Sequence, residues 1–256
     1  ETLRKLTIED PNLVIKIDEE SGETIMAGMG VLHLDVAVNL IKDAKVEIVT
    51  SEPLINYRET ITGSCEPVMA KSPNRHNKIF MKVEPLEPEI AEMCRNGTLS
   101  EMKDKKETAQ ILRDHGWEPD VAKKVMRFDT RGNIMINGTR GVQFVDESSD
   151  SLLSGFDEVM SEGGLTKEQV RDCKFTFTHF VPHEDTAHRG LSQLGPASRR
   201  ACLAAFLSAQ PMILEPMLAI EVRVPTDLID NVSSVLQGKR GKVLDMQQKG
   251  ATSIVI

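Results

Sequence analysis

The feature that most constrains this sequence is an alternating strand that runs into a polar loop and then into a patterned helix. In KFTFTHFVPH, residues 174–183, Phe175 and Phe177 recur at every second position, as in a strand with one buried face. After the loop HEDTAHRG, the run PASRRACLAAFLSAQP, residues 196–211, places Pro196 in a first helical turn and gathers Ala, Leu and Phe on one face. Such a helix packs on a sheet, so we expect an α+β fold.

Length and composition predict a soluble protein with more than one hydrophobic core. The chain has 256 residues, whereas a domain averages roughly 150. No apolar run approaches the roughly 18 residues of a membrane span. The start, ETLRKLTIEDP, has no Met and no signal-peptide pattern, which favours an internal fragment. The four cysteines form no CxxC pair, which fits a reducing cytoplasm.

Net charge and missing motifs limit the possible activities. A formal charge of −8 argues against a protein that coats nucleic acid, because phosphate binding needs clustered Lys and Arg. Any RNA contact is therefore expected to be local. No GxxxxGK(S/T) phosphate loop occurs, and GMG at 28–30 is too short for a dinucleotide fingerprint. From this chain alone we expect no GTP hydrolysis, no catalytic residue, no cofactor and no metal.

Two flanking regions show similar patterns of strands and helices. Residues 1–57 predict the order helix, strand, strand, helix, strand, with the second helix at 31–43 and the last strand at 45–51. This is a split βαβ pattern without its first strand, which upstream sequence would supply. Residues 213–256 predict a strand at 217–225, a helix at 227–241, and strands at 242–248 and 252–256.

The middle region, residues 58–212, begins with a predicted hairpin. Strands at 58–70 and 78–86 flank the basic segment KSPNRHN. A charged helical stretch at 88–125 predicts a solvated insert, because charge runs are usually solvated faces. A Gly-rich loop is expected at 131–141 and a helix at 151–163.

The sharpest local feature is THFVPHEDTAHRG, which gathers half of the six histidines. A metal-dependent hydrolase is one interpretation, but His183 and His188 are five residues apart and would not share a helix face as in HExxH. A nucleophilic arrangement of Ser192, His188 and Asp185 is another, although no GxSxG elbow accompanies it. A polar loop that merely ends a strand is the third.

The segment HEDTAHRG, followed by QLGPASRRACLAAFLSAQPMILEP, resembles the signature of the elongation factor 2 family of archaea and eukaryotes. Similar stretches follow the family order: the N-terminal run through GMGVLHLDV, then TSEPLINYRET, AKSPNRHNKIFMKVEPL and LQGKRGKV. Val31, where the family usually has Glu, and the less Gly-rich LSQLGP depart from the pattern. These departures affect packing and loop stiffness rather than the family assignment.

The resemblance implies a division into parts of three domains. Residues 1–57 would be domain III and residues 213–256 the start of domain V, both truncated ferredoxin-like folds. Residues 58–212 would be domain IV, with a βαβ-crossover fold of the ribosomal-protein type and tip loops at 71–78 and 183–195. GTP and Mg²⁺ would belong to a domain outside this chain, in a parent that resembles a translocation GTPase.

The resemblance also implies specific site residues. His188, directly before Arg-Gly, would be the histidine converted to diphthamide, whose added arm carries a fixed positive charge toward RNA. The tip-loop residues that would contact tRNA and mRNA are Lys71, Ser72, Pro73, Asn74, Arg75, His76, Asn77, His183, Asp185, Arg189 and Gly190. The residues that would contact ribosomal RNA are Lys239, Arg240 and Lys242.

The implied function is ribosomal translocation of tRNA and mRNA in the cytoplasm. Expected partners are the ribosome with its rRNA, A- and P-site tRNA and mRNA, the diphthamide-synthesis enzymes, and ADP-ribosylating toxins of the diphtheria type; no membrane is expected. Two alternatives stay open at this point, a His-cluster metal-dependent hydrolase and a protein-interaction fragment without an RNA role.

Overall fold

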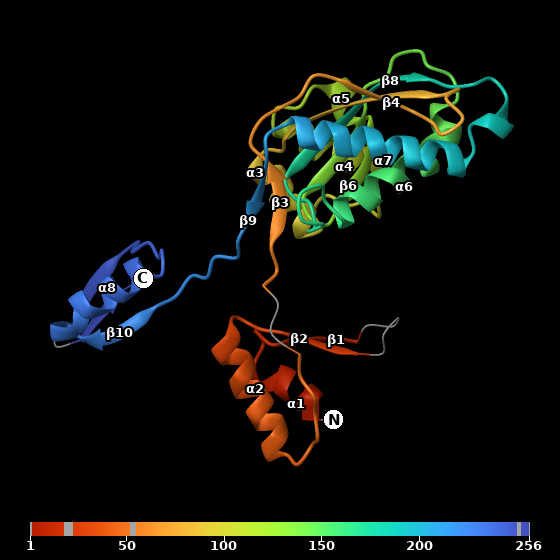
Figure 1. Ribbon diagram of the computed structural model, residues 1–256. Coiled ribbons are helices and arrows are strands. Elements are labelled where there is room, and N and C mark those ends of the chain that lie inside the picture. The colour runs from red at the N-terminus through yellow and green to blue at the C-terminus, as the bar shows by residue number, and fades with distance from the viewer. Residues whose placement is uncertain (1, 18–22, 52–54, 250–251, 256) are drawn as a thin grey trace. The chain divides into compact units, whose positions relative to one another are not determined.

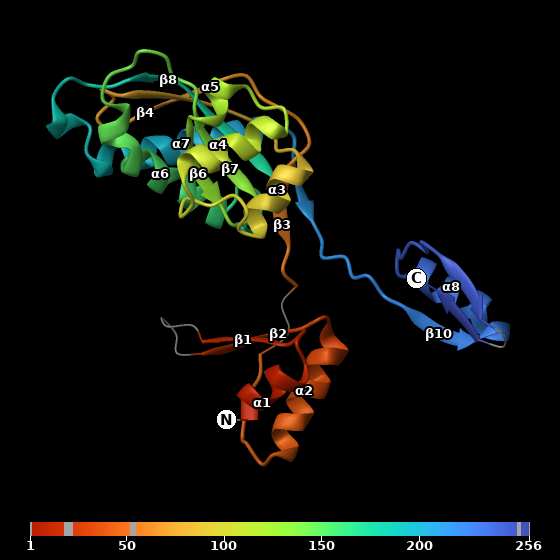
Figure 2. The same ribbon diagram turned by 180° about the vertical axis from the view of Figure 1, so that it is seen from behind.

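The computed structural model describes residues 2–17, 23–51, 55–249 and 252–255. The chain divides into two compact units, one from Asn56 to Pro216 and one made of Glu1–Ile55 and Met217–Ile256. Here the central unit is 56–216, the N-terminal segment is 1–55 and the C-terminal segment is 217–256. Figures 1 and 2 show each part from opposite sides.

The central unit is built on a five-stranded sheet of order β4-β5-β8-β7-β6. Its strands are β4 (Val68–Lys71), β5 (Lys78–Pro85), β6 (Val125–Asp129), β7 (Asn133–Asn137) and β8 (Cys173–Val181). β7 and β8 run parallel and are joined through α6 (Val145–Ser161), whereas the other neighbouring pairs are antiparallel. The mixed α+β architecture and a βαβ crossover are therefore present in this unit.

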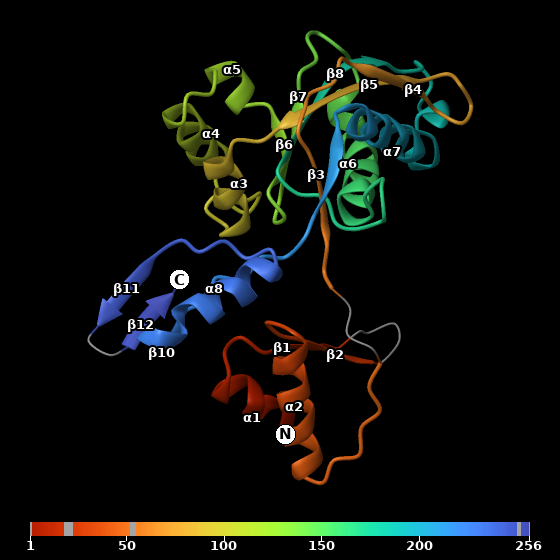
Figure 3. The same cartoon turned by 60° about the vertical axis from the view of Figure 1, so that its left-hand side comes forward.

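Two helices cover one face of this sheet. α6 packs against α7 (Leu191–Ser208), and Figure 3 shows both on the opposite side of the sheet from α3, α4 and α5. The predicted alternating strand is β8, whose Phe175 and Phe177 are fully buried in the core beneath these helices. The predicted helix begins earlier than expected, at Leu191, so Pro196 lies inside α7. Buried Leu194 anchors the additional turn in the core.

The charged stretch at 88–125 is a packed layer, and the prediction of a solvated insert is wrong for its inner face. The stretch forms α3 (Pro88–Arg95), α4 (Lys105–Asp114) and α5 (Pro119–Ala122). Ile90 of α3 and Leu112 of α4 join Ile134 and Ile136 of β7 in a second core. Each helix carries only a narrow apolar stripe, which the surrounding charges mask in the sequence.

The loop predicted at 131–141 is also wrong in part, because residues 133–137 form β7. Ile134 and Ile136 point into the second core and Met135 into the first, so this strand is buried on both faces. Gly132, at φ +91°, and Gly138 flank the strand and give it the appearance of a loop in the sequence. A strand this short and without alternation leaves no period-2 signal.

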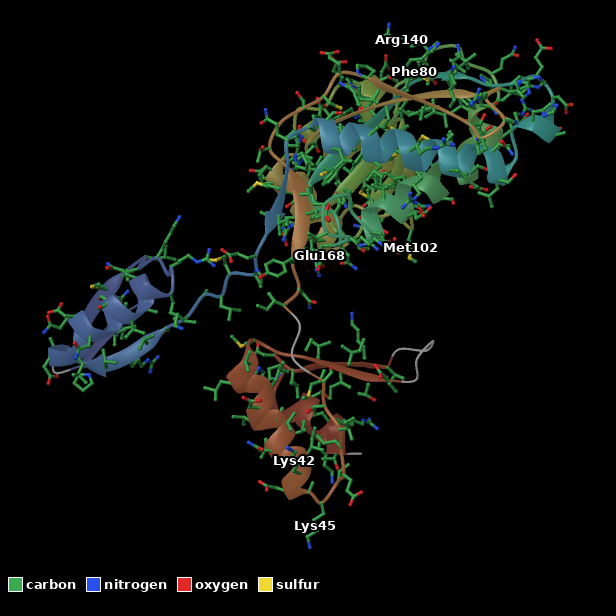
Figure 4. All side chains as sticks on the ribbon, viewed as in Figure 1. Lys42, Lys45, Phe80, Met102, Arg140 and Glu168 are labelled. Atoms are coloured by element: carbon green, nitrogen blue, oxygen red, sulfur yellow. The ribbon has the colours of Figure 1, made fainter. Side chains whose placement is uncertain are left out.

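The chain enters and leaves the central unit on two paired strands. β3 (Arg58–Ile61) pairs antiparallel with β9 (Pro211–Leu214), with Arg58 opposite Leu214. Glu59 of β3 is fully buried, and its carboxylate accepts hydrogen bonds from the backbone N–H groups of the loop that contains Glu168, at 2.7–3.1 Å. Figure 4 shows Glu168 close to this end of the unit. The strand predicted at 58–70 is therefore two strands in separate sheets.

The N-terminal segment follows the predicted order up to its second helix. It contains α1 (Thr2–Glu9), β1 (Val14–Ile17), β2 (Thr24–Ala27) and α2 (Val31–Asp43). The connection between β1 and β2, where EESGE, residues 19–23, has the composition of a turn, falls largely outside the described residues. Asp10 contacts the His33 ring at 2.6 Å, and the Asn12 N–H and this ring hold the pKa of Asp10 below its usual value.

The prediction of a strand at 45–51 is wrong, because those residues pair with no neighbouring strand. A strand needs a neighbour to receive its backbone hydrogen bonds, and the sheet described in the N-terminal segment is the pair β1-β2. Val49 of this stretch is fully exposed.

The C-terminal segment confirms the predicted order of strand, helix and two strands. β10 (Val222–Pro225), η2 (Thr226–Leu228), α8 (Ile229–Gly238), β11 (Met246–Lys249) and β12 (Thr252–Val255) form an antiparallel sheet of order β10-β12-β11 with one main helix. In the part of the chain that the structure describes, no helix is both long and apolar enough to cross a bilayer.

Candidate nucleic-acid interface

Two loops meet at one end of the central unit. Loop A, residues 72–77, connects β4 to β5, and loop B, residues 182–190, connects β8 to α7 through the short helix η1 (Thr186–His188). Lys78 at the start of β5 faces Val181 at the end of β8, so both loops leave the sheet at the same edge. The structure thus brings the two predicted tip loops together.

Asn77 is the main link between the two loops, and it is fully buried. Its Nδ2 donates to the backbone carbonyl of His188 at 2.8 Å and to Ser72 Oγ at 3.0 Å. Its Oδ1 accepts a hydrogen bond from the His183 N–H at 2.8 Å. One amide therefore holds both ends of the segment 183–188.

Asn74 supplies a second link from loop A. Its Nδ2 also donates to the His188 carbonyl, at 2.9 Å, and its backbone N–H donates to Gln193 Oε1 of α7 at 3.0 Å. The loop that places Asn74 turns tightly, because Arg75 adopts a left-handed conformation at φ 63° and its N–H donates to the Ser72 carbonyl. The carbonyl of His188 thus receives two amide donors.

Three imidazoles cluster where the loops meet. The ring centroids of His183 and His188 lie 4.6 Å apart, and His76 of loop A lies 5.0 Å and 5.1 Å from them. His183 Nδ1 accepts a hydrogen bond from the Asp185 N–H, which requires that this nitrogen carry no proton. The side chain of His188 stays 45% exposed, with its Nε2 4.0 Å from an Asp185 oxygen.

Arg189 is placed differently from the other cations of the loops. Its side chain is only 6% exposed, and its Nη2 donates to Glu147 of α6 at 2.8 Å. Its guanidinium stacks 3.7 Å from the centroid of the Phe144 ring. In this arrangement Arg189 anchors loop B to α6, so it is not presented as a free contact for RNA.

The exposed members of the site are mainly basic or small. Lys71, Pro73, Arg75, His76, Asp185 and Gly190 are exposed, whereas Ser72 and Asn77 are buried and Asn74 and His183 are half-buried. A Cβ on Gly190 would meet open space, so the backbone there is accessible. Local positive charge thus gathers on the loop A side, at Lys71 and Arg75, although the chain as a whole carries −8, while loop B exposes the carboxylates of Glu184 and Asp185.

Neither catalytic interpretation gains support from the geometry. Among the described residues no group of three or more His, Cys, Asp or Glu side chains is arranged to hold a metal ion. Asp185 Oδ1 accepts from the Ala187 N–H as the cap of η1, and within the described chain His188 has no hydrogen bond to Ser192. The nucleophile, base and acid are therefore not connected.

The remaining predicted basic cluster lies in the C-terminal segment. Lys239, Arg240 and Lys242 follow α8 and are exposed, with Arg240 at φ 62°. Three residues that support the tip are absent from the prediction, namely Phe144, Glu147 and Gln193. Gln193 belongs to the predicted loop range, but Phe144 and Glu147 are more than forty positions before their partner Arg189 and carry no sequence signal of this role.

Comparison with protein families assigns three stretches of the chain. Residues 1–52 match the model for elongation factor G domain III, residues 97–210 the model for domain IV, and residues 212–256 the model for the elongation factor G C-terminus. These matches follow the order expected from the sequence motifs.

Curated relatives are similar over the whole chain. It is 71% identical to elongation factor 2 of Cenarchaeum symbiosum over 255 residues, which cover 100% of this chain and 35% of that protein. It is 46% identical to elongation factor 2 of Sulfurisphaera tokodaii over 98% of this chain and 34% of the relative. The chain thus spans about a third of the length of these relatives. It belongs to the elongation factor 2 family and corresponds to domains III, IV and the C-terminal region of that family.

Proposed function

We propose that this chain acts in ribosomal translocation, with loops A and B of the central unit contacting the tRNA–mRNA duplex in the decoding centre. The observation that carries the proposal is the joining of the two loops around His188, with the backbone fixed and the imidazole exposed. Membership of the elongation factor 2 family supports ribosomal translocation as the process in which the chain acts. GTP binding and hydrolysis would belong to the part of the protein outside this chain.

The chemistry of the tip suits contact with RNA rather than bond making. Arg75 and Lys71 offer exposed positive charge to phosphates, while Gly190 lets RNA approach the backbone. His188 would be modified to diphthamide at its C2 carbon, which adds a trimethylammonium-bearing arm at a partly exposed position of loop B. The enzymes of diphthamide synthesis, and toxins that ADP-ribosylate diphthamide, would act on this exposed ring.

The other parts of the chain would serve the same process. We propose that residues 1–57 and 213–256 are portions of ferredoxin-like domains III and V, and that 58–212 is a ribosomal-protein-type domain IV. Exposed Lys239, Arg240 and Lys242 would then contact ribosomal RNA. Domain III would relay the nucleotide state of the GTPase domain to domain IV.

His188→Ala in the intact factor tests the proposal. We expect a several-fold rise in frameshifting in a reconstituted translation assay and an unchanged melting temperature, because the side chain is exposed and the clamped group is the backbone carbonyl. Arg75→Glu should act in the same direction, since it reverses a charge that faces RNA. His115→Ala, an exposed histidine after α4, is the matched control. Wild-type reading-frame maintenance in both tip variants would overturn the proposal.

A further inference from the structure

We infer that Asn77 is a positioning residue, whose side-chain amide fixes the backbone at His188 and so determines how the imidazole is presented. The inference rests on the proposed function and adds a residue to it that does not itself touch RNA, because Asn77 is fully buried. Its side chain makes three hydrogen bonds, one to Ser72 of loop A and two to loop B, at His183 and His188.

The imidazole of His188 cannot fix its own position. The nearest charged partner of Nε2 is Asp185 at 4.0 Å, beyond hydrogen-bond distance, and the His76 and His183 rings only pack against it. The position of a side chain with so few contacts of its own is set by the backbone that carries it. That position matters, because a functional group must lie within roughly 0.5 Å of its productive geometry. The orientation of His188 must therefore come from the hydrogen bonds to its carbonyl.

Asn74 and Asn77 both donate to that carbonyl, but they are not equivalent. Asn74 is half-buried, so water can take its place when the side chain is removed. Asn77 lies in the interior, so its loss leaves the His188 carbonyl with only the half-buried Asn74 as a side-chain donor and removes one of the donors to the buried Ser72 Oγ. Loss of Asn77 should thus release loop B, whereas loss of Asn74 should loosen it only partly.

The substitution Asn77→Asp tests the two hydrogen bonds that Asn77 donates separately from the one that it accepts. An ionised aspartate has nearly the shape of asparagine and still accepts the His183 N–H, but it cannot donate to the His188 carbonyl or to Ser72 Oγ. A residue that merely fills space would tolerate this change better than Asn77→Ala. A positioning residue would be impaired by both, and Asn74→Ala gives a graded comparison in a variant whose interior is intact.

The experiment uses the intact factor from its native cells in wild-type, Asn77→Asp, Asn77→Ala, Asn74→Ala and His188→Ala forms. Three readouts are taken on each form: amide hydrogen exchange of the peptide 183–190, amide hydrogen exchange of the buried strand β8 as a measure of the stability of the central unit, and reading-frame maintenance. In the peptide 183–190 we expect about tenfold faster exchange in both Asn77 variants and a smaller increase in Asn74→Ala. Exchange of β8 should be near-unchanged in Asn74→Ala and should stay slow, though faster than in the wild type, in Asn77→Asp, because that variant buries a charge. Frame loss in the Asn77 variants should equal that of His188→Ala.

Two results would overturn the inference. One is wild-type exchange of 183–190 in Asn77→Asp, and the other is rapid exchange with normal frame maintenance while His188→Ala loses the frame. If His188→Ala and Arg75→Glu both keep the frame, the proposed function fails instead. The exchange data then still decide whether the Asn77 amide fixes loop B.

Discussion

Glu59 shows how a single charge can be built into the interior of this protein. Its carboxylate is fully buried and, among the residues that the structure describes, makes no ion pair; it accepts hydrogen bonds from the backbone N–H groups of Gly164, Leu165, Thr166 and Glu168. Oriented amides stabilise a carboxylate strongly in a low-dielectric interior. Gly163 lies so close that a Cβ would be 2.3 Å from Glu59 Oε2, so the loop wraps tightly around this group.

Replacing Glu59 with Ala should lower the free energy of unfolding of the central unit by roughly 3 kcal/mol or more, because several buried donors lose their acceptor together. Trp117, the single tryptophan of the chain, reports this unfolding in urea. Glu158→Ala, which removes the partner of Arg199 in an exposed ion pair, is the control and should cost less than about 1 kcal/mol. Equal effects of the two substitutions would contradict this account of Glu59.

The candidate site could be predicted from the sequence only for residues that belong to one continuous motif. His183 and His188 stand out because histidines crowd a short loop after an alternating strand. The burial of Arg189 could not be foreseen, since it depends on Phe144 and Glu147 from another element. The same holds for Asn77, whose role arises from hydrogen bonds across more than a hundred residues of sequence.

Helices α6 and α7 approach each other closely at one glycine. A Cβ on Gly155 would lie 2.4 Å from the Gly195 carbonyl oxygen and 2.5 Å from the Arg199 nitrogen, both of them backbone atoms. Ser198 Oγ donates to the Leu152 carbonyl at 2.6 Å in the same contact. The two helices therefore cannot separate slightly without losing a buried hydrogen bond as well as packing.

Gly155→Ala should destabilise the central unit by about 1–3 kcal/mol, because overpacked cores force backbone shifts. Gly195→Ala on the facing helix is the matched control: its Cβ would meet nothing closer than 3.5 Å. The gain in helix propensity is offset by the Pro196 ring, which disfavours a helical residue with a Cβ before it, so this substitution should change the stability by less than about 1 kcal/mol. Urea denaturation followed by Trp117 fluorescence distinguishes the two, and equal losses would refute the close-contact explanation.

Hydrophobic periodicity predicted β8 and α7. It failed for β7 and for the buried faces of α3 and α4. β8 and α7 alternate or repeat apolar residues, so their type and inner faces follow from the pattern. β7 has no polar face, and its flanking glycines give the appearance of a loop. α3 and α4 are covered by charge on the side away from the second core, so the surrounding polarity conceals their inner stripe.

At the scale of the whole molecule, all four cysteines belong to the central unit. The reactivity of their thiols therefore reports whether this unit is folded. Cys94, Cys173 and Cys202 are buried, and burial raises the pKa of each thiol to about 12. Cys65 is half-buried, and burial raises its pKa as well. Because the thiolate is the reactive form, the folded unit should resist alkylation.

Iodoacetamide at pH 8 should label Cys65 first and the three buried cysteines only on unfolding, as followed by mass spectrometry. A raised thiol pKa stabilises the folded state fully below the unfolded value of about 8.5. This contribution is lost as the pH rises from there toward 12. The urea midpoint reported by Trp117 should therefore fall above pH 9, and fast native labelling of Cys202 would contradict the described burial.

The pairing of β3 with β9 has a mechanical consequence. Residues 57 and 215 lie at the open end of this short ladder, where Arg58 faces Leu214. A force that pulls these two points apart would break the hydrogen bonds between β3 and β9 one at a time. The reason is that hydrogen bonds between antiparallel strands lie perpendicular to the strands, along the direction of this force. The ladder would yield at low force, whereas the layered body beyond it would stay rigid.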